Sequence, residues 1–157
     1  MSWYRELHPT KEGKRKYRFT TTKRMSFPLC GHLATHPDCI FLERGFEWAT
    51  IEDGMIHIAA GYSWDGCSPK AYIGIPPIGM WVGTPDFEGT IDASLVHDVL
   101  FQFAKVGKYN FVSANYQFYV MMLRNSFKLA SLYYQAVNDF GMKFWKKRKG
   151  KQTVYYL

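Results

Sequence analysis

The sequence predicts an α+β fold, in which an N-terminal antiparallel sheet with a β-hairpin precedes a bundle of about three helices. Three observations lead to this prediction: strand-like runs in the first half, a stretch rich in Gly and Pro over residues 61–89, and helical spacing of apolar residues after residue 90. Strands that come first and helices that follow are typical of the α+β class. With 157 residues, the chain has the length of a single domain spanning residues 1–157.

The expected strands are short runs of β-branched, aromatic and aliphatic residues. They cover residues 17–23, 39–43, 46–51 and 55–60. The last two runs flank Asp53-Gly54, a pair that suits a tight hairpin turn. In the second arm, Ile56 and Ile58 fall on one face of the strand, which indicates a half-buried antiparallel hairpin.

The stretch over residues 61–89 is expected to be loop. Its apolar part, residues 73–81, contains Pro76 and Pro77, which exclude a helix there. An apolar loop of this length normally packs over a site or meets a partner.

The second half of the chain is expected to form the helices. Thr90 or Asp92 is suited to capping a helix that runs to about Ala104, and Ser113 is suited to capping the next. A third helix is expected over residues 127–140. The side chains expected to face inward from the second helix are Phe118, Met121 and Met122.

The charge is divided along the chain, with two basic ends around an acidic body. The net charge is +7, but residues 1–24 and 143–157 carry +6 each, and residues 25–142 carry −5. The chain therefore divides into a basic N-terminal arm with the first strand (1–24), strands and loops (25–89), helices (90–142) and a basic aromatic tail (143–157). No known nucleic-acid-binding motif accompanies the basic ends, so we expect them to attach to an acidic protein surface rather than to read bases.

Composition excludes several classes of protein. No run approaches the ~18–20 apolar residues of a membrane span, so no transmembrane segment is expected. The first residues lack the apolar core of a secretory signal, and three cysteines are too few for a disulfide scaffold. Synthesis in a reducing, intracellular compartment is expected.

The strongest candidate for chemistry is the pair His97-Asp98 within the first helix. Adjacent residues on a helix point about 100° apart, and a buried imidazole or carboxylate needs a partner. One interpretation makes His97 a base or metal ligand and Asp98 a ligand or orienting group. The other makes the two a hydrogen-bonded structural pair.

A second candidate is the loop that begins at Gly61. Asp65 and Ser68 offer loop acceptors, a metal ligand or a nucleophile. The same two residues are also suited simply to satisfying the amides of the loop.

Together the two segments resemble an uncharacterised family that is widespread in tailed-phage genomes, a domain of unknown function. The residues that carry the resemblance are Gly61, Tyr62, Asp65, Gly66, Ser68, Ala93, His97, Asp98, Leu100 and Phe101. The resemblance covers about residues 40–141. That family usually continues with Ala-Asp on the next helix, where this chain has Ala114-Asn115. The resemblance implies a phage origin more than any activity.

A looser resemblance, to phospholipase A2, bears on mechanism. In that family a helical His-Asp pair activates water and binds calcium, and a later Asp orients the His. Carried over, His97 would be the base, Asp98 a calcium ligand and Asn115 the orienting residue. An Asn cannot stabilise an imidazolium as a carboxylate does. With a first helix that ends near Ala104 and a second that starts near Ser113, His97 and Asn115 would also differ in level by about 7 Å.

A third cluster has the residue types of a zinc site. It consists of Cys30, His32, His36 and Cys39 within ten residues. Structural zinc sites usually bring ligand pairs together from separate segments, so unlinked loop residues are the other interpretation.

The basic tail is the candidate binding segment, with Trp145 followed by Lys146, Lys147, Arg148 and Lys149. Such a run binds phosphates, membrane surfaces or acidic proteins, or is a solvated tail. The residues suited to pinning the two ends to the body are Trp3, Tyr4, Tyr155, Tyr156 and Leu157.

Two functional hypotheses follow. The preferred one is a non-enzymatic subunit of a phage particle, made in the host cytoplasm and placed in the tail or connector, whose partners are other virion proteins in a larger assembly. The alternative is a small metal-dependent hydrolase, of phospholipase A2-like or cell-wall type. It would use His97, Asp98, Asp65 and Ser68, with Asp98 and Asp65 holding a divalent cation such as calcium or zinc.

Overall fold

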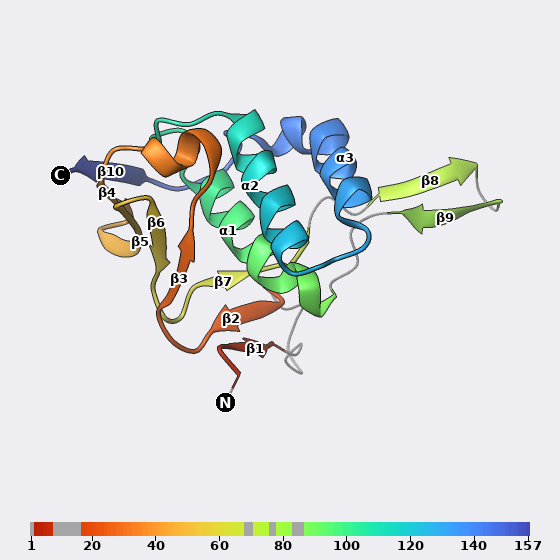
Figure 1. Cartoon of the computed structure of the whole chain (residues 1–157), viewed down its shortest axis with the longest axis horizontal. Coiled ribbons are helices and arrows are strands. Elements are labelled where there is room, and N and C mark those ends of the chain that lie inside the picture. The colour runs from red at the N-terminus through yellow and green to blue at the C-terminus, as the bar shows by residue number, and fades with distance from the viewer. Residues whose placement is uncertain (1, 8–16, 68–70, 76–77, 83–86) are drawn as a thin grey trace.

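The computed structural model describes residues 2–7, 17–67, 71–75, 78–82 and 87–157, with the backbone alone described for residues 71–75 and 78–82. It has the predicted α+β architecture, with antiparallel sheets followed by three α-helices. Figure 1 shows the largest sheet on one side of the helices, with the N-terminal strands below. The predicted fold class is therefore confirmed.

The largest sheet has five antiparallel strands in the order β10-β4-β5-β6-β3. These strands are β3 (Met25–Pro28), β4 (Cys39–Glu43), β5 (Phe46–Glu52), β6 (Met55–Ile58) and β10 (Gln152–Tyr156). The C-terminal strand β10 pairs along the whole of β4, from Gln152 opposite Glu43 to Tyr156 opposite Cys39. The tail is therefore part of the fold.

The hairpin between β5 and β6 turns where predicted. Asp53 and Gly54 both have positive φ, 49° and 74°, as a tight two-residue hairpin turn of this hand requires. Ile56 and Ile58 are fully buried, while His57 between them is partly exposed. The predicted alternation is confirmed.

A smaller sheet holds the N-terminus. It consists of β1 (Tyr4–Glu6), β2 (Phe19–Thr21) and β7 (Ser63–Trp64) in that order. The rings of Trp3 and Trp64 are parallel, with centroids 6.1 Å apart, and Tyr4 packs edge-on against Phe19. Trp3 and Tyr4 therefore pin the start of the chain, as expected. Residues 8–16 of the basic arm lie outside the described residues.

The apolar segment expected to be loop contains a two-stranded hairpin instead. It consists of β8 (Ala71–Ile75) and β9 (Ile78–Val82), with Ile75 opposite Ile78. Figure 1 shows these strands extending from the body beside the helices, at the end opposite β10. The loop prediction was wrong because prolines in a segment exclude a helix there but do not exclude strands in the neighbouring residues.

Three α-helices form the second layer. They are α1 (Ile91–Gln102), α2 (Phe111–Arg124) and α3 (Ala130–Phe140). Short 3₁₀ segments also occur: η1 (Gly31–Thr35) precedes β4, η2 (Glu88–Thr90) leads into α1, and η3 (Gly141–Phe144) follows α3. Within the described residues, no helix is both long and apolar enough to span a membrane.

The cap of α2 differs from the prediction. Asn110, not Ser113, is the N-cap residue, and its Oδ1 accepts hydrogen bonds from the Ser113 backbone N–H at 2.8 Å and from Ser113 Oγ at 2.9 Å. Asn110→Ala is expected to lower the free energy of unfolding by about 1 kcal/mol, because the first turn of α2 loses its acceptor. Ser113→Ala keeps the backbone bond and should have a smaller effect in the same urea titration; an equal effect would contradict this role for Asn110.

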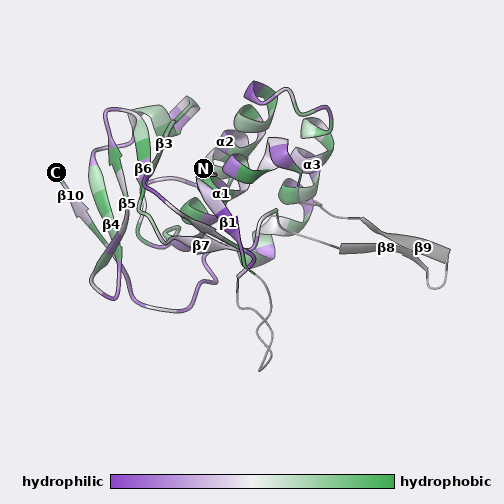
Figure 2. Cartoon of the chain, turned by 90° about the horizontal axis from the view of Figure 1, so that it is seen from below, coloured by the Kyte–Doolittle hydropathy of each residue, from purple (hydrophilic) through white to green (hydrophobic). Residues whose placement is uncertain are grey.

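One apolar core joins the large sheet to the helices. Phe41 on β4 stacks on Phe103 just beyond α1, with ring centroids 5.0 Å apart. Figure 2 shows the sheet and the helices as two layers, with apolar segments on the strands and on α1. The predicted inward residues of α2 are buried, namely Phe118, Met121 and Met122.

Candidate functional site around the His-Asp helix

Helix α1 directs His97 and Asp98 toward different neighbours. His97 Nε2 lies 2.8 Å from Asn115 Oδ1 on α2, and the imidazole packs between Phe101 and Phe118, with ring centroids 4.4 and 4.9 Å away. The Asp98 carboxylate instead interacts with the charges of Arg148 and Asp65. Successive residues on an α-helix point about 100° apart, which explains why the two side chains meet different neighbours.

The hydrogen bonds of His97 continue across all three helices. Asn115 Nδ2 donates to Asn138 Oδ1 on α3 at 2.9 Å, which leaves Asn115 Oδ1 as the acceptor for His97. This assignment places the imidazole proton on Nε2. The arrangement is a polar chain that joins α1, α2 and α3, with His97 and Asn115 buried and Asn138 partly exposed.

The expected 7 Å mismatch between His97 and Asn115 is wrong. Helix α1 ends at Gln102, five residues after His97, and α2 begins at Phe111, four residues before Asn115. The two residues therefore lie at nearly the same level of an antiparallel helix pair. The Asn110 cap, which starts α2 earlier than Ser113 would, makes the contact possible.

Burial makes His97 a weak base. Its side chain is 7% exposed, and desolvation lowers its pKa to about 4, although the hydrogen bond with Asn115 partly opposes this shift. The imidazole is therefore neutral at pH 7. A general base works best when its pKa lies near the working pH, so His97 is poorly suited to that role.

The pKa of Asp98 is shifted in the opposite direction, upward. Burial raises its pKa to about 7; the nearby Arg148 guanidinium lowers the pKa, and the Asp65 carboxylate raises it further. Asp98 has no hydrogen bond to any residue that the structure describes, and its side chain is only partly exposed. Displaced pKa values are frequent at functional sites, and structural charge networks also produce them.

The structure thus brings Asp98 and Asp65 into one region and leaves His97 on the other side of α1. Asp65 itself is exposed at the end of β7. Ser68, the other candidate in this loop, lies outside the described residues.

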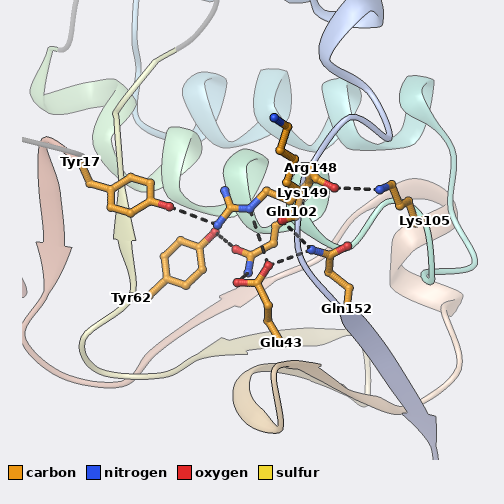
Figure 3. A network of polar contacts seen from close by, with 8 residues as sticks. All are labelled: Tyr17, Glu43, Tyr62, Gln102, Lys105, Arg148, Lys149 and Gln152. Carbon is orange, nitrogen blue, oxygen red and sulfur yellow. Dashed lines mark hydrogen bonds and ion pairs between the residues drawn. The ribbon is translucent and has the colours of Figure 1, made fainter.

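Next to Asp98, a polar network connects α1 to the C-terminal segment. Gln102, one helical turn beyond Asp98, accepts a hydrogen bond from Tyr62 Oη at 2.6 Å and donates one to Glu43 Oε2 at 3.1 Å. Arg148 Nε lies 3.8 Å from Glu43 Oε1. Figure 3 shows Arg148 at the centre of these side chains. Asp98 and Gln102 are four residues apart, so the sequence could have shown that both side chains lie on this face of α1.

The same network holds the basic tail. Arg148 Nη2 donates to Tyr17 Oη at 3.4 Å, and Gln152 Nε2 donates to Glu43 Oε1 at 2.8 Å. Lys105 Nζ donates to the Arg148 carbonyl oxygen at 2.8 Å (Figure 3). Arg148, expected to be a docking residue, is therefore engaged within the protein.

A cavity of about 170 Å³ opens beside the network. Its walls include the side chains of Tyr17, Glu43, Trp48, Tyr62, Gln102 and Arg148. Sequence reasoning missed Glu43, Trp48 and Gln102, because only the pairing of β4 with β10 brings these segments together with the tail.

In the candidate zinc cluster, Cys39 Sγ lies 3.9 Å from His36 Nδ1, but the His36 ring has other partners as well. Both ring nitrogens of His36 are engaged, Nδ1 with the Pro37 carbonyl oxygen at 2.8 Å and Nε2 as acceptor from the Lys108 N–H at 3.1 Å. Burial raises the pKa of the Cys39 thiol to about 11. Within the part of the chain that the structure describes, no three His, Cys, Asp or Glu side chains are placed to hold a metal ion.

Comparison with models of known protein families, with curated proteins and with solved structures gave no match.

Proposed function

We propose that the protein is a non-enzymatic subunit of a phage particle, in the tail or connector, that attaches to an acidic neighbour through its basic C-terminal segment. The observation that carries the proposal is that this segment is held at both ends. Before it, Trp145 packs edge-on against Phe101 and Phe111, and after it Gln152 starts the paired strand β10. The exposed lysines between these anchors are Lys146, Lys147 and Lys149.

A segment whose backbone is already fixed is well suited to binding a partner, because a flexible tail loses conformational entropy when it becomes ordered on binding. Side chains on a fixed backbone lose less conformational freedom on association than those of a free tail. Their charge also steers encounter with an acidic surface. The phage setting of this proposal rests on the resemblance carried by Asp65, His97 and Asp98 with their neighbours.

The subunit proposal predicts a charge effect on assembly. In phage that carry Lys146→Glu/Lys147→Glu, the copy number of the protein per particle is expected to fall at least tenfold, because two like charges then face the acidic partner. Quantitative mass spectrometry of purified particles measures this. Lys23→Glu/Lys128→Glu, which changes two exposed lysines elsewhere, is the matched control and should leave incorporation unchanged. Absence of the wild-type protein from the particles would overturn the proposal.

A metal-dependent hydrolase is the second candidate, and one contact favours it. The 2.8 Å bond between His97 Nε2 and Asn115 matches the contact that the phospholipase A2 resemblance implies. The neutral state of His97 and the division of His97 from Asp98 and Asp65 make this candidate weaker. Calorimetric titration with Ca²⁺ and Zn²⁺ distinguishes the two: binding that Asp98→Asn abolishes would favour the hydrolase.

A further inference from the structure

We propose that the cavity beside the Arg148 network binds a single uncharged sugar ring. The cavity has a volume of about 170 Å³ and is open to solvent. It lies where β5, β7, the end of α1 and the C-terminal segment meet, and it involves none of the exposed lysines of the subunit proposal. The two proposals are therefore independent.

The size of the cavity limits the ligand to about one six-membered ring. An apolar protein cavity of about 150 Å³ holds one benzene molecule. A cavity slightly larger and open on one side accommodates a single saturated ring with its hydroxyl groups at the mouth. Longer saccharides would extend into solvent.

The charges in the wall favour an uncharged ligand. Glu43 and Arg148 carry opposite charges, with Oε1 and Nε 3.8 Å apart. Both carboxylate oxygens of Glu43 also accept hydrogen bonds from side-chain amides, at 2.8 Å from Gln152 and 3.1 Å from Gln102. The Asp98 carboxylate also interacts with Arg148, so the positive charge of Arg148 is countered within the protein, and an ion would have to lose its hydration to enter.

The wall retains hydrogen-bonding capacity. The Arg148 guanidinium has five N–H donors, of which Nε faces Glu43 and one on Nη2 reaches Tyr17. Arg148 Nη1 has no hydrogen bond to any described residue. The Tyr62 hydroxyl, which donates to Gln102, keeps a lone pair for a further donor. A ligand that both donates and accepts fits this wall, as hydroxyl groups do.

An aromatic surface completes the match with a sugar. The Trp48 ring is held by Phe46, with centroids 4.3 Å apart, and by an edge-on contact with Tyr62 at 5.7 Å. A sugar ring has apolar C–H faces and a polar hydroxyl edge. Ligand sites commonly combine an aromatic wall with a few fixed polar groups in this way.

The test is a titration followed by NMR. Glucose, galactose, mannose and N-acetylglucosamine are added separately to the full chain, and the indole N–H signal of Trp48 is observed. At least one of these is expected to bind with a dissociation constant of about 1 mM. Glucuronate and protonated glucosamine should bind at least tenfold more weakly. Failure of all four neutral sugars, or preference for a charged one, would overturn the proposal.

Ser63→Phe is the variant that fills the cavity. Ser63 lines the cavity and makes one long contact, 3.5 Å to the Gly61 carbonyl oxygen, so the fold loses little. Binding should weaken at least tenfold, whereas Thr153→Phe on β10, outside the cavity, should leave it unchanged. Trp48→Leu provides a second variant if Ser63→Phe does not fold, as judged by circular dichroism; because it lacks the indole reporter, its binding is followed by saturation-transfer NMR of the sugar, with the wild-type chain measured in the same way. Unaltered binding in a folded cavity variant would contradict the assignment.

Discussion

Asp98→Asn is expected to raise the free energy of unfolding at pH 8 by about 2 kcal/mol, roughly half of what the displaced pKa implies, since the side chain is partly exposed. Burial, opposed by Arg148 and assisted by Asp65, raises the pKa of Asp98 to about 7. At pH 8 the folded protein therefore contains an unfavourable, partly buried charge. Asparagine has nearly the same shape and no charge. Chemical denaturation at pH 8 measures the gain.

The stabilising direction of Asp98→Asn follows from the way the contribution of Asp98 to stability changes with pH. Between pH 3.8 and about 7, folded Asp98 binds more protons than unfolded Asp98, so its contribution to stability falls as pH rises through this window. Asp98→Asn should remove that fall. Asp139→Asn, at an exposed position on α3, is the matched control and should change little. If Asp98→Asn is less stable than wild type at pH 8, the ion pair with Arg148 outweighs the burial of the charge.

His97→Ala is expected to lower the free energy of unfolding at pH 7 by about 3 kcal/mol. The substitution leaves a cavity between Phe101 and Phe118 and removes the donor that satisfies Asn115 Oδ1. Urea unfolding at pH 7 measures the loss, with His32→Ala at an exposed position as the control. A variant as stable as wild type would show that the chain from His97 to Asn138 is not a structural element.

As pH changes, the contribution of His97 to stability changes in the direction opposite to that of Asp98. The pKa of folded His97 is about 4, so between pH 6.5 and 4 the unfolded chain binds more protons and stability falls as pH falls. Asp98 acts in the reverse direction over nearly the same window. The two should largely cancel in the wild type, and Asp98→Asn should uncover a decline below pH 6.5.

The parts of the fold that were predictable are local. The β5–β6 hairpin follows from Asp53-Gly54 and from the alternation that buries Ile56 and Ile58. Such features depend on neighbours within a few residues, which the sequence displays directly. The same reasoning located α1 but misplaced the start of α2, because Asn110 and Ser113 are both good caps and only packing selects between them.

The candidate site was less predictable because it is assembled from distant segments. Tyr62, Gln102 and Arg148 come from a loop, a helix and the tail, and no short motif links them. The His97-Asp98 pair is recognisable in the sequence because a buried imidazole and a buried carboxylate both need partners. The partner of His97 is Asn115, which depends on how α1 and α2 are aligned along their axes. The charged neighbour of Asp98 is Arg148, which depends on the path of the C-terminal segment.

The pairing of β10 with β4 also has a kinetic consequence. Gln152 and Glu43, which face each other across the two strands, are 109 residues apart. Closing a loop of that length is entropically unfavourable, and contacts of high sequence separation slow folding. Until β10 arrives, the edge of β4 presents unpaired backbone groups that other chains can extend. During synthesis, the large sheet must therefore remain open on that side until the residues of β10 have left the ribosome.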